Sequence, residues 1–151
     1  MGGLYYPNQS IEVLIGSKSG TTRTSVEMES TYQTTESPTE ATKSFECGGY
    51  SNVVFDVLYT MGTSETSNSI EIKLESSTDR TNWTRLPTDT TTGGTSTLAA
   101  REFTFVGTDG AAATTQIKLD VNYKFMRISC KETGVAANKG SVYVEATLGG
   151  R

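Results

Sequence analysis

The chain lacks histidine entirely, and its 151 residues include only two cysteines, one tryptophan and three prolines. Without histidine, the Ser-His and Cys-His nucleophile arrangements and the zinc sites that need an imidazole ligand are excluded. Two cysteines are too few for a four-cysteine zinc site. No apolar run approaches the roughly 20 residues of a membrane-spanning helix. We therefore expect no metal ion, no cofactor and no membrane partner.

Clusters of like charge are also missing. The 13 basic and 17 acidic residues are mixed along the chain and give a net charge of -4. Nucleic-acid binding needs a basic stripe, so we expect no nucleic-acid partner. The first ten residues, MGGLYYPNQS, hold no positive residue and no hydrophobic region of signal-peptide length. We therefore expect a protein made and folded in a cytosol.

The two cysteines, Cys47 and Cys130, lie on separate predicted strands far apart in the sequence. Free cysteines behave as small apolar residues, and burial in the core is one interpretation. A disulfide between neighbouring strands is the other, and it needs Cα atoms within about 7 Å. The sequence leaves both open.

One stretch, Ile70–Pro87 (IEIKLESSTDRTNWTRLP), indicates a strand, a polar corner and a short aromatic strand. Ile70, Ile72 and Leu74 alternate with charged residues, which is the period of a strand with one buried face. The seven polar residues after Glu75, Ser76–Asn82, predict a corner and a candidate contact loop. Trp83 then restarts the apolar pattern, and a tryptophan is the largest apolar anchor that a core can have.

Alternating runs of this kind recur along the chain, separated by loops rich in Gly, Ser and Thr, and no segment sustains a helical period. This pattern predicts an all-β protein: a two-sheet antiparallel β-sandwich, jelly-roll-like, with 8–10 strands. A small closed barrel is the second choice. The length fits one domain, residues 10–151, preceded by an N-terminal arm, residues 1–9.

The core of this sandwich is expected to be anchored by large apolar side chains on the inward strand faces. These anchors are Trp83, Phe55, Ile72, Leu74, Phe103, Phe105, Ile128 and Val144.

Candidate contacts with a partner come from three places. The arm has an apolar cluster without a period, and the run Thr88–Thr97 (TDTTTGGTST) predicts a long hairpin tip or a projecting loop. The third place is a tyrosine predicted to point away from the core. The candidate contact residues are Leu4, Tyr5, Tyr6, Pro7, Thr91, Gly93 and Tyr143.

Paired carboxylates are a possible catalytic signal, because a glycosidase works with two of them. Glu27 and Glu29 share a predicted strand face, but they alternate with Val26 and Met28 as solvated residues do. We interpret them as solvated charges. The sequence therefore predicts no enzyme and no catalytic residue.

Three phrases together resemble small β-sandwich structural proteins of tailed-bacteriophage virions: IEIKLESSTDRTNWTRLP, REFTF and YKFMRISCKETGVAANKGSVYVEATLGG. In that group a strand ending in E-S-x-D-x-x-N-W-T-x-L is followed by a strand like Lys124–Cys130, a loop and a final strand like Gly140–Ala146. The resemblance covers Ile70–Leu148. Arg80 stands where the glycine of a tight Asp-Gly turn is often seen, so we expect a longer corner here.

This resemblance implies a non-enzymatic capsid decoration (cement) protein that bridges major capsid protein subunits on the head surface. It further implies production in the bacterial host cytoplasm, location in the virion, and contacts with the major capsid protein and with copies of itself as a homo-oligomer.

Two alternatives remain. A carbohydrate-binding β-sandwich module, on a fibre or an enzyme, predicts a strip of exposed aromatic side chains on one sheet face. A buried Trp83 with scattered tyrosines favours the structural protein instead. A tail or neck accessory protein differs from a decoration protein only in its partner.

Overall fold

The computed structural model describes residues 9–63, 69–92, 95–100, 102–106, 110–133 and 138–150, with the backbone alone at 87–92, 95–100, 102 and 106. All the regular structure in these ranges is β-strand, so no helix there could span a membrane. The strands are β1 (Ser10–Ile15), β2 (Ser17–Ser19), β3 (Thr22–Thr24), β4 (Val26–Glu27), β5 (Thr42–Glu46), β6 (Asn52–Thr60), β7 (Ser69–Ser77), β8 (Thr84–Arg85), β9 (Pro87–Thr92), β10 (Thr95–Ala100), β11 (Glu102–Val106), β12 (Ala112–Asp120), β13 (Phe125–Thr133) and β14 (Ser141–Gly149).

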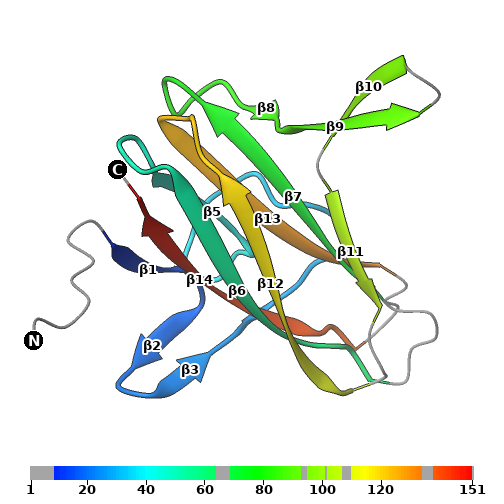
Figure 1. Cartoon of the computed structure of the whole chain (residues 1–151). Helices are drawn as coiled ribbons and strands as arrows, with labels where there is room; N and C mark the ends of the chain where they lie inside the picture. Colours follow the sequence, from blue (N-terminus) through cyan, green and yellow to red (C-terminus); the bar gives the residue numbers. More distant parts are fainter. Residues whose placement is uncertain are drawn as a thin grey trace, which may run out of the picture.

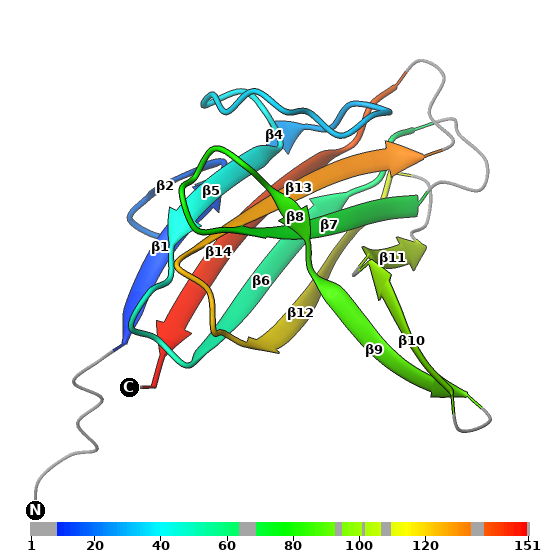
Figure 2. The same cartoon turned by 90° about the horizontal axis from the view of Figure 1, so that it is seen from above.

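Two large antiparallel sheets face each other across a shared core (Figures 1 and 2). The β14 sheet has the order β1-β14-β6-β12, and β4 also pairs with β14. The β7 sheet has the order β11-β7-β13-β5, and β8 also pairs with β7. Two hairpins, β2–β3 and β9–β10, form small sheets of their own. The prediction of an all-β, two-sheet antiparallel sandwich is confirmed.

An inserted hairpin splits one edge strand of each large sheet. On the same side of β14, Ile15 of β1 lies opposite Val144 and Val26 of β4 lies opposite Val142. The residues between them, 16–25, hold the hairpin β2–β3. In the same way β8 and β11 share one side of β7, and the hairpin β9–β10 lies between them in the sequence.

If each split strand is counted once, eight strands remain, four in each sheet. Numbered along the chain, they lie in the order 1-8-3-6 in the β14 sheet and 5-4-7-2 in the β7 sheet. Every connection except that between the fourth and fifth strands crosses from one sheet to the other. This is the arrangement of a jelly roll, in which two Greek keys fold over each other.

Aromatic pairs join the two sheets inside the core. Phe45 of β5 and Phe55 of β6 meet edge to face, with ring centroids 5.8 Å apart. Tyr59 of β6 and Phe105 of β11 lie 6.3 Å apart. Such geometries add to the hydrophobic gain from burying the rings. Because β6 belongs to one sheet and β5 and β11 to the other, both pairs hold the sandwich closed.

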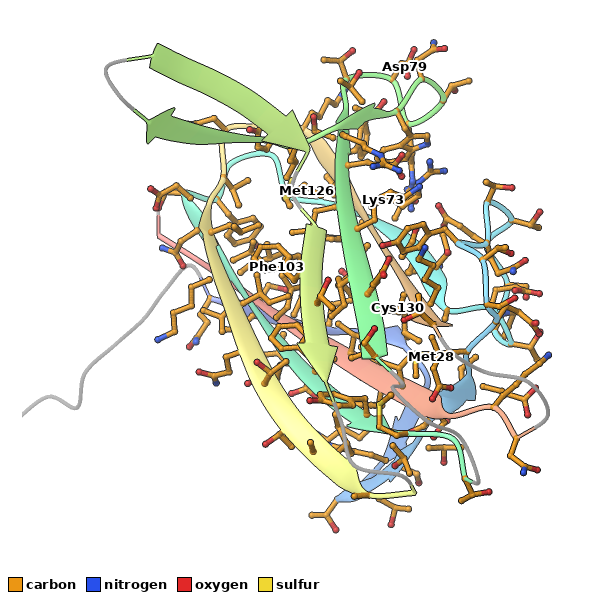
Figure 3. The ribbon with its side chains drawn as sticks, turned by 90° about the vertical axis from the view of Figure 1, so that its right-hand side faces the viewer. Met28, Lys73, Asp79, Phe103, Met126 and Cys130 are labelled. Atoms are coloured by element: carbon orange, nitrogen blue, oxygen red, sulfur yellow. The ribbon has the colours of Figure 1, made fainter. Side chains whose placement is uncertain are left out.

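Most of the expected core anchors lie inside. The buried ones are Phe55, Ile72, Leu74, Ile128 and Val144. Phe103 and Phe105 are half-buried and pack against the core, because β11 is an edge strand. Figure 3 shows Phe103 and Met126 between the sheets and Lys73 on the outer side of the β7 sheet.

The prediction that Trp83 anchors the core is wrong. Its side chain is only half-buried and lies under the Arg127 guanidinium, 4.6 Å from the ring centroid. Leu86 reaches the core instead, with 2% of its surface exposed. Its backbone amide bonds the Leu74 carbonyl, so the two residues lie side by side. Leu86 lies three positions after Trp83, and an odd offset along an extended chain places side chains on opposite faces.

Both cysteines are free and buried. The interpretation as small core residues is therefore confirmed, and the two are not joined by a disulfide. Burial raises the pKa of the Cys47 thiol to about 11 and raises that of Cys130 further.

Candidate functional site

The hairpin β9–β10 stands away from the sandwich, at the edge of the β7 sheet that β8 and β11 form (Figures 1 and 2). Its ladder runs from Thr92 opposite Thr95 to Pro87 opposite Ala100. The predicted contact Thr91 lies on β9, opposite Ser96. The other predicted contacts near the tip and on the arm, Gly93 and Leu4–Pro7, lie outside the described residues.

The ladder on β7 continues across the base of this hairpin. Arg85 lies opposite Glu75, and Glu102 lies opposite Lys73. Between these pairs, the Leu86 amide donates a hydrogen bond of 3.1 Å to the carbonyl of Leu74. Successive positions of β7 are therefore paired first by β8 and then by β11. The hairpin is an insertion that leaves the edge strand in register.

The hairpin β2–β3, in contrast, lies against the β14 sheet, because its side chains bind residues of that sheet. Lys18 Nζ lies 3.2 Å from Glu145 Oε2. The Arg23 guanidinium lies over the Tyr143 ring, 5.4 Å from the centroid. Both contacted residues lie on the outer face of β14, which this hairpin covers.

Tyr143 is therefore not the exposed contact that the sequence predicted. It does point away from the core, but only 1% of its surface is exposed. Its hydroxyl donates a hydrogen bond of 2.7 Å to Glu145 Oε2. Burial, followed by this bond, raises the pKa of Tyr143 to about 12. The sequence missed this because the covering hairpin is inserted more than a hundred residues earlier.

A shallow groove of about 470 Å³ remains on the β14 sheet beside the covering hairpin. Arg23 and Tyr143 form one side of it. Asp56 and Gln116 lie on its floor, where Gln116 Nε2 donates a hydrogen bond of 2.6 Å to Asp56 Oδ1. The lining of the groove is mixed, since Val57 and Leu58 also border it. Within the described ranges no group of three acidic or cysteine side chains could hold a metal ion.

The corner between β7 and β8 is organised by one carboxylate, Asp79 (Figure 3). Asp79 Oδ1 accepts hydrogen bonds of 2.8 Å from the backbone amides of Thr81 and Asn82, and Oδ2 accepts one from Asn82 Nδ2. The Ser77 hydroxyl donates a fourth, at 2.9 Å. These donors, the Asn82 amide first, hold the pKa of Asp79 far below its usual range. These hydrogen bonds therefore give the corner a defined conformation.

Arg80, next to this carboxylate, has a φ of 61°, in the left-handed region. Its Nε donates a hydrogen bond of 2.9 Å to Ser44 Oγ, and its Nη2 donates one of 3.3 Å to the Ser44 carbonyl. The guanidinium lies over the Phe125 ring at 5.7 Å, and Lys124 Nζ lies 5.2 Å from the same centroid. The corner was predicted to be longer than a tight turn, and the structure confirms it.

The outer face of the β7 sheet carries a layer of paired charges and rings. Lys73 and Lys131 lie 4.8 Å and 4.7 Å from the centroid of Tyr32. Glu75 bonds Arg127 at 2.7 Å and lies 3.4 Å from Lys73. Most of these side chains are covered, so they attach the outer loops to the sheet. Within the described ranges no aromatic side chain is fully exposed, and no exposed aromatic strip forms there.

No protein-family model and no curated protein matches this chain. Among solved structures, it is similar to a carbohydrate-binding module, CBM28, which is specific for non-crystalline cellulose. The TM-score is 0.44 and the sequence identity 16%, over 87% of this chain and 76% of that one. A similarity at this level does not extend that protein's ligand to this chain.

Proposed function

We propose that this chain is a non-enzymatic structural protein of a phage virion, a capsid decoration protein that bridges major capsid protein subunits. The hairpin β9–β10 is its principal contact element in this proposal. The observation that carries the proposal is the insertion of this hairpin between successive ladder positions of an edge strand, from which its backbone points away from the sandwich (Figure 2).

Elementary β-sheet physics supports a contact role for this hairpin. A two-stranded ribbon is marginally stable in water, because it has too little apolar surface to bury. Threonine favours extended strands, and β9 holds four threonines (PTDTTT). Among the described elements, β9 and β10 pair only with each other, so the ribbon has two open edges. A partner surface that covers it therefore stabilises a conformation that the sequence already prefers.

The arm, residues 1–9, remains a second contact in the proposal, and copies of the chain assembled around capsid junctions add these contacts through avidity. A tail or neck role would use the same elements with another partner. The carbohydrate-binding alternative is less favoured, because the described aromatic side chains form no exposed strip.

Removal of the hairpin tests this proposal. A variant lacking residues 87–101 joins Leu86 directly to Glu102 and makes β8 and β11 one continuous edge strand. We expect it to keep the circular dichroism spectrum and the thermal unfolding midpoint of the parent. We expect its occupancy on purified capsids that lack the protein, measured by co-sedimentation, to fall at least about tenfold.

A second variant, Thr97→Pro, keeps the length of the hairpin and breaks its ladder, since proline cannot donate a hydrogen bond. It should reduce occupancy in the same direction. Unchanged occupancy of a folded deletion variant would overturn the contact role of the hairpin. Binding to isolated tails or necks, with none to heads, would overturn the capsid assignment.

A further inference from the structure

Five side chains from the corner, from the start of β13 and from the residue before it gather near the base of the hairpin β9–β10. We call them the corner patch: Arg80, Trp83, Lys124, Phe125 and Arg127. Arg127 covers one ring at 4.6 Å, while Arg80 and Lys124 lie over the other at 5.7 Å and 5.2 Å. Both rings are half-buried, whereas Arg80 and Lys124 are exposed.

The backbone holds Arg80 in an unfavourable conformation. Within the described residues it is the only residue other than glycine with a positive φ. A glycine would adopt this φ without a steric cost, yet the position holds an arginine. Strain of this kind persists where the surroundings enforce it, and it concentrates at binding sites. Here the Arg80 amide donates a hydrogen bond of 2.9 Å to Ser77 Oγ, and Ser44 holds the side chain. The exposed guanidinium keeps further N–H donors for another group.

The charge of the patch differs from that of the chain, whose net charge is -4. Arg127 and Lys73 pair with the carboxylate of Glu75, whereas Asp79, which the neutral donors of its loop hold, keeps its negative charge. Glu46, opposite Phe125 on β5, is the exposed carboxylate on this face of the strand. Arg80 and Lys124 balance Glu46 and Asp79, and Arg127 and Lys73 exceed Glu75 by one positive charge, so the patch with its neighbours carries a net charge of +1. An acidic surface therefore complements the patch, and a second copy of the same patch would repel it.

We propose that the corner patch binds an acidic, carboxylate-bearing segment of a protein partner. Arginine and tryptophan are the residues most often found at the energetic centre of protein interfaces. A guanidinium stacked on a ring presents its donors in the planar fork that a carboxylate accepts. Under the proposed function that partner is the capsid, because Trp83 directly precedes the strand from which the hairpin is inserted. One partner can then cover the hairpin and the patch together.

The substitution Arg80→Gly separates binding from folding. Glycine adopts the observed φ without strain, so the unfolding midpoint should stay within a few degrees of the parent value. Binding of poly-L-glutamate at low salt, followed by NMR chemical shifts, should weaken about tenfold. Lys124→Glu should weaken it at least as much. Lys118→Glu makes the same charge change on exposed β12 of the other sheet, and it is the matched control that should leave binding within about twofold.

Equal binding of poly-L-glutamate by the parent, Arg80→Gly and Lys124→Glu would overturn the proposal that the corner patch binds an acidic segment. Stronger binding of heparin or duplex DNA than of poly-L-glutamate would also overturn it, in favour of a general polyanion site. Capsid occupancy of the same variants separates the two proposals. If the parent fails to decorate capsids while peptide binding still depends on the patch, the proposed function fails and the patch stands. If hairpin deletion abolishes decoration and the patch variants decorate and bind normally, the patch fails and the function stands.

Discussion

Trp83 and Leu86 lie three residues apart, and only one of them reaches the core. Leu86 lies beside Leu74 and is buried, while Trp83 packs on the outer face against Arg127. Size and hydrophobicity alone would favour the tryptophan as the anchor. The ladder position decides otherwise, because a strand alternates its faces whatever the side chain.

This difference predicts unequal stability losses. Phe55→Ala removes a fully buried ring and should lower the free energy of unfolding by about 3–5 kcal/mol. Trp83→Ala removes a half-buried ring and one cation–π contact, and it should cost about 1–2 kcal/mol. Equilibrium urea unfolding followed by far-ultraviolet circular dichroism measures both. A loss for Trp83→Ala as large as that for Phe55→Ala would show that the tryptophan supports the core.

At the scale of elements, each of two hairpins interrupts an edge strand. One hairpin lies against its sheet, and the other stands away from the sandwich. The β2–β3 hairpin carries Lys18 and Arg23, which meet Glu145 and Tyr143 on the sheet below. The sequence of β9 and β10 contains one charged residue, Asp89, and no basic one. Opposite charges therefore hold the first hairpin on its sheet, and no comparable set of cations is available to the second.

The contact of the hairpin β2–β3 with the outer face of β14, which we call its closed position, should depend on the ionisation of Glu145. The Tyr143 hydroxyl, then Lys18 and Arg23, lower the pKa of this carboxyl against the opposing effect of burial. A lowered pKa in the folded state contributes stability above the unfolded value of about 4.3, and this contribution is lost as the pH falls through the folded pKa. Neutral solutions should therefore keep the hairpin closed, and strong acid should release it.

Glu145→Gln mimics the released state at neutral pH. We expect faster amide hydrogen exchange at Ser17–Ser19 and Thr22–Thr24, with unchanged exchange in the central strand β6. Lowering the pH of the parent below about 4 should move the Lys18 and Arg23 side-chain NMR signals toward those of this variant. Unchanged protection in the variant would mean that Glu145 does not hold the hairpin.

At the scale of the whole molecule, one buried carboxylate ties the two sheets together at the end where β6 stops and β14 begins. Glu132 continues the inward face of β13, in line with Ile128 and Cys130, and is 0% exposed. Its Oε1 accepts the Gly62 amide at 2.7 Å, and its Oε2 accepts the Gly140 amide. A carboxylate at a core position is stable only when such donors satisfy it.

Glu132→Ala should be strongly destabilising, because it leaves the two glycine amides without this acceptor. We expect a loss of about 2–6 kcal/mol in the free energy of unfolding, at about 1–3 kcal/mol for each of the two buried donors. Glu29→Ala, which removes one of two surface carboxylates that pair with Lys139, is the matched control and should have a much smaller effect. Thermal unfolding of both variants measures the difference. Equal losses of stability in the two variants would contradict the role of Glu132 in joining the two sheets.

Local pattern predicted the parts of this fold that depend on neighbouring residues. Alternation identified the inward faces of β6, β7, β13 and β14, including Phe55, Ile72, Ile128 and Val144. The threonine-rich run was predicted as a hairpin or projecting loop, and a hairpin forms there. The polar corner was predicted as a contact loop, which stays a prediction. The local sequence pattern failed to predict burial where a segment distant in the chain covers the outer face of a strand, as at Tyr143.

The sequence by itself determined the β class of the regular structure in the described residues, the apolar faces of the long strands and the absence of histidine chemistry, because strand period and residue type are local properties. Tertiary structure alone decided which outer faces are covered, that two hairpins interrupt edge strands, and that Arg80, Lys124 and two half-buried rings meet at one corner. These features depend on ladder register between segments far apart in the chain. Register is fixed only when every strand buries its apolar face at once.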